Sequence, residues 1–392
     1  MGLLEYLFIF LIFSIPLGQI FRIDYQDVGI LISDVIAVLI AFVYLVKVFR
    51  RRIKHGVTFV PMIIFSSALS LSLAINLFNL KTDQLLVSFS YLVRFMSYIS
   101  ILFVFSYLSK EFREKKLQTI LLFSGFLFIL LGFFQTFLYP NLRNLYYAGW
   151  DEHLYRFFSS FLDPNFAGAF LVLYFIFVLG LFLNQTEGKK KNLLSGLLLL
   201  TFISIFTTFS RSAYIMLLIS FFIFLFTKKR RKELIIAIVG FLILFLIFFS
   251  NSLFGEGTKL LRTASISARF ESAEKAIQIF KENPIFGIGF NSYKYAQEKH
   301  NFLVNKGLKI RSAAGTDNSF LFILATSGVV GFFAFVYLIF SLLRFSLKKG
   351  DRGKVLFVSI IALGVGSLFN NLIFYPFILL WMLILIGITE NT

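Results

Sequence analysis

Arginines that stand alone beside long apolar runs are the first residues whose type and setting indicate chemistry. Arg211 lies between Ser210 and Ser212, with an apolar run on each side and almost no loop. A charge so close to hydrocarbon is costly unless it is paired or faces water, so Arg211 is either a binding residue or a turn residue that reaches the membrane surface. A guanidinium binds a diphosphate through parallel, charge-assisted hydrogen bonds. We therefore take Arg211 as the first candidate for an anion-binding residue.

Further candidates lie in and directly after the one long polar stretch, residues 251–316. This stretch carries twice as many Lys and Arg residues as Glu residues, which suits anionic headgroups or an anionic substrate. Arg262 and Arg269 are the arginines that we expect to contact such a substrate. Asp317, directly before Asn318 and a long apolar run, can accept a proton from an attacking hydroxyl group or simply cap the following helix.

Arg156 begins a third polar segment, which ends in Asp163-Pro164-Asn165 at the start of another apolar run. An ordinary helix entry explains the end of this segment, because Asp is a good N-cap and Pro is tolerated in the first turn. It does not explain an arginine so near the membrane. Arg156, Asn165 and Asn318 are therefore candidate substrate contacts.

The elements that must position these groups are membrane helices. The chain is 58% hydrophobic and only 15% charged, whereas a soluble domain is about 25% charged. Its apolar residues come in runs of about 20, the length that a helix needs to cross a bilayer. Such runs lack the strict alternation of barrel strands, and an isolated helix satisfies its own backbone in lipid. The sequence therefore predicts an all-α, polytopic membrane protein.

We expect about twelve spans, and at least ten, because two pairs of runs are separated by only a few residues. This gives nine spans in residues 1–250, an external loop over 251–316 and three spans in 317–392. An amphipathic helix in the loop is predicted to begin at Ser267, to share apolar positions such as Phe270 and Ile277, and to end at Asn283-Pro284. The predicted spans are 3–21, 28–46, 58–78, 85–108, 117–138, 165–183, 193–209, 212–227, 233–250, 318–343, 355–370 and 372–389.

The net charge of +18 is explained by topology and does not indicate a nucleic-acid partner. More than half of the 38 Lys and Arg residues lie in alternate short loops, such as Lys47–Lys54 and Lys228–Lys232. The positive-inside rule assigns these loops to the cytoplasm, which also places both termini there and the long loop outside. Arg94 lies inside a predicted span and is expected to pair with a carboxylate such as Asp34.

Some chemistries are excluded by composition or lack support. The chain has no cysteine, so disulfides, thiolate metal sites and a cysteine nucleophile are absent. Its three histidines are scattered and make no metal-ligand spacing. We expect neither a metal nor another cofactor.

Taken in order, these motifs resemble those of the O-antigen ligase and polymerase superfamily. The resemblance covers residues 150–345 and rests on the Arg156-led segment, Ser210-Arg211-Ser212, Arg269 with the later Asn283-Pro284-Ile285-Phe286-Gly287-Ile288-Gly289, and Asp317-Asn318 with Ser327-Gly328. It implies a membrane glycosyltransferase with a fold of the lipid-phosphosugar-dependent type C, in the bacterial inner membrane. Such enzymes take a glycan from undecaprenyl diphosphate on the periplasmic side.

The resemblance also assigns roles and leaves one choice open. The two external arginines of the family correspond to Arg211 and Arg269, which would hold the diphosphate. Ligases, which pass the glycan to the lipid A core, typically have a His where this chain has Asp317, whereas many polymerases, which extend another lipid-linked repeat unit, are similar to this chain there. We therefore expect a polymerase with Asp317 as the base, and a ligase is the alternative.

Two other classes remain alternatives. One is a peptidoglycan-type polymerase of the shape and elongation family, which the Pro-Asn and Ser-Arg-Ser motifs fit less well. The other is a transporter or flippase for the same lipid-linked glycan. Transporters usually show internal repeats and helices broken near the midplane. We find no convincing repeat of the two halves, and the basic groups cluster on the outer face and not at the midplane, which favours surface chemistry over translocation.

Overall fold

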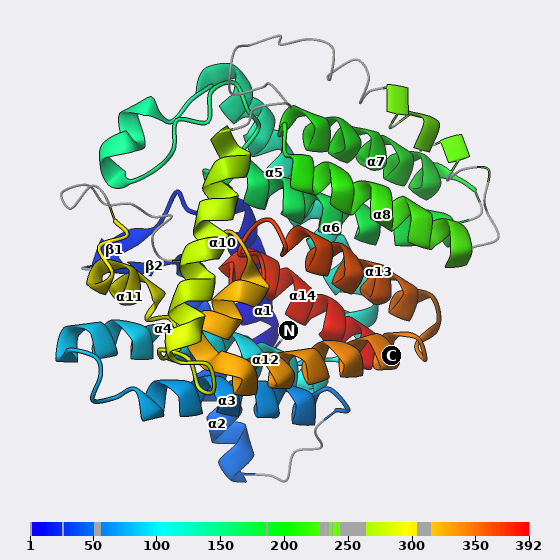
Figure 1. Ribbon diagram of the computed structural model, residues 1–392. Helices are drawn as coiled ribbons and strands as arrows, with labels where there is room; N and C mark the ends of the chain where they lie inside the picture. The colour runs from blue at the N-terminus through cyan, green and yellow to red at the C-terminus, as the bar shows by residue number, and fades with distance from the viewer. Residues whose placement is uncertain are drawn as a thin grey trace.

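The computed structural model is almost entirely helical (Figure 1). It describes residues 2–25, 27–50, 56–185, 187–227, 264–303 and 315–391, with residues 232, 235, 236, 238–240, 242 and 243. One short antiparallel hairpin, β1 Ile23–Tyr25 and β2 Val28–Ile30, joins the first two helices. The long helices follow the apolar runs of the sequence: α1 Leu3–Leu17, α2 Ile32–Arg50, α3 Phe59–Ile75, α4 Thr82–Val104, α5 Leu117–Leu138, α6 Pro164–Leu183, α7 Lys189–Thr207, α8 Arg211–Thr227, α12 Ser319–Ser346, α13 Gly350–Gly366 and α14 Pro376–Glu390.

Every predicted span except 233–250 overlaps one of these helices, and 233–250 lies mostly outside the described residues. Within the described part of the chain, six helices are long and apolar enough to cross a membrane. Another four, α1, α3, α8 and α14, are apolar but shorter than 18 residues over their described length. The prediction of a helical membrane protein is confirmed, while the number of twelve spans stays a prediction.

The centre of the bundle is formed by α6 and α14. Nearly all of α6 is buried, and Trp381 of α14 is fully buried against it. The Trp381 ring lies 5.3 Å from Phe170 and 5.6 Å from Phe177 in edge-to-face geometry, an arrangement that aromatic rings prefer. A rigid α6 therefore fixes the position of Asn165 in its first turn.

A break in α12 shows why the motifs at 283–289 and 327–328 occur together. Gly328 has a φ of 63°, so the helix is interrupted there. The N–H groups of Ile288 and Gly289 donate to the freed carbonyls of Ala325 and Thr326, at 3.1 Å each. In return, Val329 and Val330 donate to Pro284 and Ile285, at 2.9 and 3.2 Å. The segment after α10 thus pairs with α12 and satisfies its broken backbone, as a nonpolar surrounding requires.

Two glycines make this pairing possible. Gly287 has a φ of 69° and Gly328 a φ of 63°, values that side chains with a Cβ rarely adopt. A Cβ at Gly328 would also collide with the backbone of Ile285, and one at Gly287 with that of Thr326 and Ser327. The Gly287-Ile288-Gly289 motif is therefore a turn built around α12.

Helix α10, Ala264–Glu282, is the predicted helix of the long loop, with two corrections. It begins at Ala264, so Ser267 is not its N-cap. Its buried residues are Ala276 and Ile279, whereas Phe270 and Ile277 of the predicted apolar face are exposed. The buried face packs on α12 (Figure 1), so contact with a neighbouring helix decides which face is covered. A second short helix, α11 Tyr293–Lys299, follows in the same loop.

Candidate functional site

One cavity gathers the candidate arginines at one end of the helix bundle. It has a volume of about 340 Å³, which is within the usual range for a ligand site. Arg156, Asn165, Arg211 and Arg269 all line it, although they come from a loop and three different helices. The rest of its lining is Asp151, Glu152, His153, Leu154 and Ser265. Four of the predicted site residues are therefore brought together.

Arg211 and Arg269 bring like charges to this cavity. Arg211 is the first residue of α8 and is half-buried, and its guanidinium donates a hydrogen bond to Ser265 Oγ of α10. Arg269 lies about one turn further along α10, and its charge acts unfavourably on that of Arg211. Within the described residues, Arg269 forms no ion pair and stacks on Phe369, 5.9 Å from the ring centre. Two cations held close together favour an anion with more than one charge.

Arg156 forms structural bonds within the protein, while its predicted role as a substrate contact stays a prediction. Its side chain is only 5% exposed, and its Nε and one terminal nitrogen donate to the carbonyls of Thr208 and Phe209, at 2.9 and 3.3 Å. These carbonyls lie at the C-terminal end of α7, where the last carbonyls of a helix have no N–H donor within the helix. Arg156 therefore joins its loop to the turn before Arg211, while also lining the cavity.

Asn165 is tied to the serine before Arg211. Ser210 Oγ donates to Asn165 Oδ1 at 3.1 Å, and the Asn165 backbone N–H donates to Asp163 Oδ1 at 2.7 Å. The prediction that Asp163 caps α6 is thus confirmed. Asn165 lines the cavity as well, so it can both position Ser210 and contact a ligand.

Asp317 is not the cap of α12, which removes the structural alternative to a functional role. Asn318 is the cap, because its Oδ1 accepts from the N–H groups of Phe320 and Leu321 at 2.9 and 3.1 Å. The Asp317 backbone donates to Ser272 Oγ at 3.2 Å, and Ser272 is three residues after Arg269 on α10. Asp317 therefore lies beside the cavity, about one helical turn from Arg269, although it does not line it.

The surroundings of Asp317 change its acidity. Its side chain is exposed at the surface, yet the protein around it removes part of its hydration, and this raises the pKa of the carboxyl above its ordinary value. The positive charge of Arg269 opposes the rise, and the carboxylates of Asp163 and Asp151 add to it.

The wall formed by residues 151–154 was not predicted. It belongs to a loop that carries the 3-10 helix Arg143–Ala148 and is closed by two backbone bonds, Leu142 to Glu152 at 2.8 Å and Tyr155 to Pro140 at 2.7 Å. His153 has a φ of 45°, an uncommon value that is frequent near functional sites. The Asp-Glu-His run at residues 151–153, close to Arg156, was the only feature of the sequence that could have indicated this wall. It lies in a loop, where no helical periodicity marks it.

The tyrosines of the polar loops differ in their exposure. Tyr146 and Tyr147 of this loop are exposed and remain available to a sugar ring, whereas Tyr293 and Tyr295 are buried and are not. Arg262 lies outside the described residues, so its predicted role stays a prediction.

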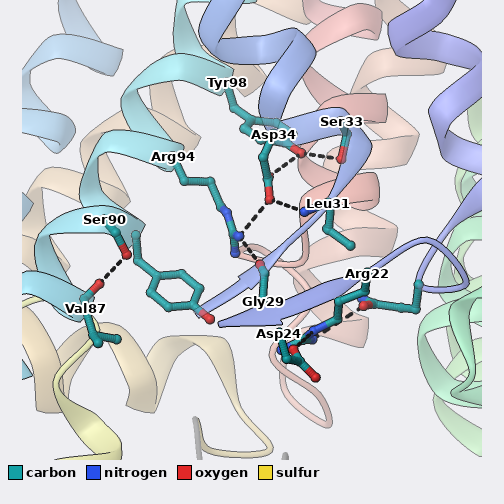
Figure 2. Close-up of polar contacts among 12 residues, drawn as sticks. Arg22, Asp24, Gly29, Leu31, Ser33, Asp34, Val87, Ser90, Arg94 and Tyr98 are labelled. Atoms are coloured by element: carbon teal, nitrogen blue, oxygen red, sulfur yellow. Dashed lines mark hydrogen bonds and ion pairs between the residues drawn. The ribbon is translucent and has the colours of Figure 1, made fainter. Parts of the chain in front are cut away.

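The membrane-embedded Arg94 belongs to a separate cluster (Figure 2). Its guanidinium forms an ion pair with Asp34 at 2.7 Å, as expected from the sequence. Asp34 also accepts from the Leu31 N–H at 2.8 Å, and the Tyr98 hydroxyl lies 3.0 Å from its other oxygen. Arg94 also donates to the Gly29 carbonyl of the β hairpin. This cluster ties α2, α4 and the hairpin together, away from the cavity.

With this geometry established, comparison with known proteins gives one finding. A family model described as O-antigen ligase matches residues 196–336. The match supports the resemblance of this chain to the O-antigen ligase and polymerase superfamily. No curated protein matches it. The matched range contains Arg211, Arg269, Asp317 and Asn318, and it excludes Arg156 and Asn165. Together with the apolar helices, the match implies an integral membrane protein of the O-antigen ligase or polymerase type.

Proposed function

We propose that this protein is a polymerase that transfers a glycan from undecaprenyl diphosphate to another lipid-linked repeat unit. The observation that carries the proposal is the cavity where Arg211 and Arg269 meet, with Asp317 about one turn away. A diphosphate is a multiply charged anion, and guanidiniums match its oxygens with paired hydrogen bonds. The exposed tyrosines of the neighbouring loop offer apolar faces for a sugar chain.

The proposed reaction is a single displacement at the anomeric carbon of the donor. A hydroxyl oxygen of the acceptor sugar forms a bond to that carbon, and the bond from the carbon to the diphosphate oxygen breaks. The hydroxyl proton passes to the Asp317 carboxylate, and undecaprenyl diphosphate leaves with the bonding electrons. Arg211 and Arg269 stabilise the charge that develops on the leaving oxygen, a contribution that is often the largest in such catalysis. We propose no metal in this step.

The polymerase is favoured over the ligase by the residue before Asn318. Ligases typically carry a His there, and this chain has Asp317. In place of an imidazole, a carboxylate with a raised pKa can serve as the base. The ligase, with the lipid A core as acceptor, is the second candidate, because the matched family model carries the ligase description.

The proposed location follows from the distribution of charge. Lys- and Arg-rich loops alternate with poor ones, and the positive-inside rule then places both termini in the cytoplasm. The cavity, which is built from residues 151–165, 211 and 265–269, would face the periplasm at the inner membrane. Lipid-linked repeat units on that side are the substrates we propose.

The test uses purified protein in nanodiscs with an undecaprenyl-diphosphate oligosaccharide. We expect a ladder of longer lipid-linked products without any lipid A-core acceptor, and none with Arg211→Ala. A single larger lipid A species that appears only with the core acceptor would establish the ligase instead. If folded protein yields neither product, the enzyme proposal fails and substrate translocation in proteoliposomes becomes the next measurement.

A further inference from the structure

The short segment Ser367–Asn370, between α13 and α14, contacts all three elements that carry the candidate reactive groups. These elements are the start of α8, which carries Arg211, the start of α12, which follows Asp317 in the chain, and α10, which carries Arg269. The segment lies outside the range that matches the family model, and the sequence suggested no role for it. We propose that it is a positioning segment, with Asn370 as its main residue, that sets the spacing of Arg211, Arg269 and Asp317.

The contact with α8 is a buried chain of hydrogen bonds. Asn370 Nδ2 donates to Ser212 Oγ at 3.0 Å, and Ser212 Oγ lies 3.1 Å from Ser210 Oγ. Ser210 in turn donates to Asn165 Oδ1. The Asn370 amide nitrogen can only donate and the Asn165 carbonyl oxygen can only accept. Ser212 therefore donates its hydrogen bond to Ser210, and Ser210 donates to Asn165. Asn370, Ser212 and Ser210 are all at most 5% exposed, so no water competes for these bonds.

The contact with α12 uses the same few residues. Ser319 N–H donates to the Ser367 carbonyl at 2.9 Å, and Ser319 Oγ to the Asn370 carbonyl at 3.3 Å. Asn318 Nδ2 donates to the Leu368 carbonyl at 3.2 Å. The orientation of Asn318, and with it the direction of the adjoining Asp317, is thereby fixed from the α13–α14 side.

The third contact is made by Phe369, whose ring lies 5.9 Å from the Arg269 guanidinium. Stacking on a ring orients a guanidinium without neutralising it. The positive charge therefore stays available to an anion while the side chain is held in place. Ser212 places Arg211, Asn318 places Asp317 and Phe369 places Arg269, all through one segment.

The proposal rests on the proposed function only for its activity measurement, so a second measurement is made without substrate. The chain has no cysteine, which allows Ile215→Cys on α8 and Glu274→Cys on α10 to be spin-labelled as a pair. Their distance distribution reports the spacing of the helices that carry Arg211 and Arg269. It is recorded in nanodiscs for the parent pair and with Asn370→Leu, which keeps the branched shape of the side chain and removes the donor, or with Ser212→Ala.

Two matched variants control for the loss of a buried polar group. Ser220→Ala removes a hydroxyl from the same helix as Ser212, but that hydroxyl bonds only to the Met216 carbonyl of its own helix. Asn391→Leu removes an amide that donates to Gly387, also within its own helix. Neither residue contacts the cavity, and we expect both controls to keep the parent distances and turnover.

We expect Asn370→Leu and Ser212→Ala to broaden the distance distribution. Both should also lower the turnover number about 10- to 100-fold, a loss typical of slightly misplaced catalytic groups. KM should change little. Broadening in a protein whose parent form transfers no glycan would support the positioning role while the proposed function fails. Parent-like distances and turnover in both variants would overturn the positioning role. Equal broadening in Ser220→Ala would overturn it too, because any lost buried hydroxyl would then have the same effect.

Discussion

Arg94 and Arg211 both belong to apolar helices, yet their electrostatic surroundings differ. Arg94 is paired with Asp34 at 2.7 Å, donates to a backbone carbonyl, and has its partner carboxylate held by Tyr98 and Leu31 (Figure 2). Arg211 instead lines a cavity together with a second arginine, Arg269, whose charge acts unfavourably on its own, and it donates to the neutral Ser265 of α10.

The difference separates a structural charge from a binding charge. Taking an ion out of water costs several kcal/mol, and a complete set of partners is what makes that tolerable. In the Arg94 cluster the set is complete within the protein. At the cavity Arg269 acts unfavourably on the charge of Arg211, so an anionic ligand would offset the repulsion between them. An arginine near the membrane is thus a functional candidate only after its partners are known.

The largest expected effect is the loss of transfer activity in Arg211→Ala and Arg269→Ala. Each removes a group that stabilises the leaving diphosphate, so the turnover number should fall on the order of 10³-fold, equivalent to about 4 kcal/mol. The melting temperature should stay close to that of the parent protein, because removing one arginine relieves the repulsion of the other. Near-parent turnover for either variant would place the diphosphate elsewhere.

Arg94→Ala should do the reverse, with a large effect on stability. It leaves Asp34 unpaired, and breaking a buried ion pair costs about 3 kcal/mol or more. We expect unfolding at clearly lower denaturant or temperature in the same membrane mimetic. Asp34→Asn/Arg94→Leu, which removes both charges, should recover part of the loss. If Arg94→Ala kept its stability but lost activity, the division between the two regions would be wrong.

Inorganic diphosphate should distinguish the regions by a smaller effect. A ligand that binds only the folded protein at ten times its Kd stabilises it by about 1.4 kcal/mol. We expect diphosphate to raise the melting temperature of the parent and of Lys281→Ala, which removes a positive charge at the far end of α10. It should have no such effect on Arg211→Ala or Arg269→Ala. An equal rise in all four proteins would mean binding outside the cavity.

The pH dependence of turnover should give the smallest change. As a base, Asp317 must be deprotonated, so activity should fall as the pH drops through its pKa, which lies above the ordinary value near 3.9. Arg269 lowers that pKa, so Arg269→Gln should move the acid limb to higher pH, within its reduced turnover. A limb that stays in place would show that Asp317 is not the group that titrates. Asp317→Asn should remove the limb, and Glu271→Gln, on the exposed side of α10, should leave it unchanged.

Much of this protein was determined by its sequence. Apolar runs of about 20 residues predicted the helices, because a chain in lipid must satisfy its backbone within each span. The isolated Arg211, the Asp163 cap and the Arg94–Asp34 pair were all predicted from residue type and local setting. A charge beside hydrocarbon needs a partner or water wherever the fold places it, so such residues can be recognised from the sequence alone.

Only the tertiary structure decided which of these groups meet and which partners they have. In the structure, Arg156 donates to carbonyls at the end of α7, and Asn318, not Asp317, caps α12. Tyr293 and Tyr295 are buried. The tertiary structure also paired residues 284–289 with the break in α12, and brought Asp151 and Asn370 to the site from segments that were not predicted to contribute to it. These outcomes depend on contacts between residues far apart in the chain, and the periodicity of a single helix carries no information about which neighbour will cover it.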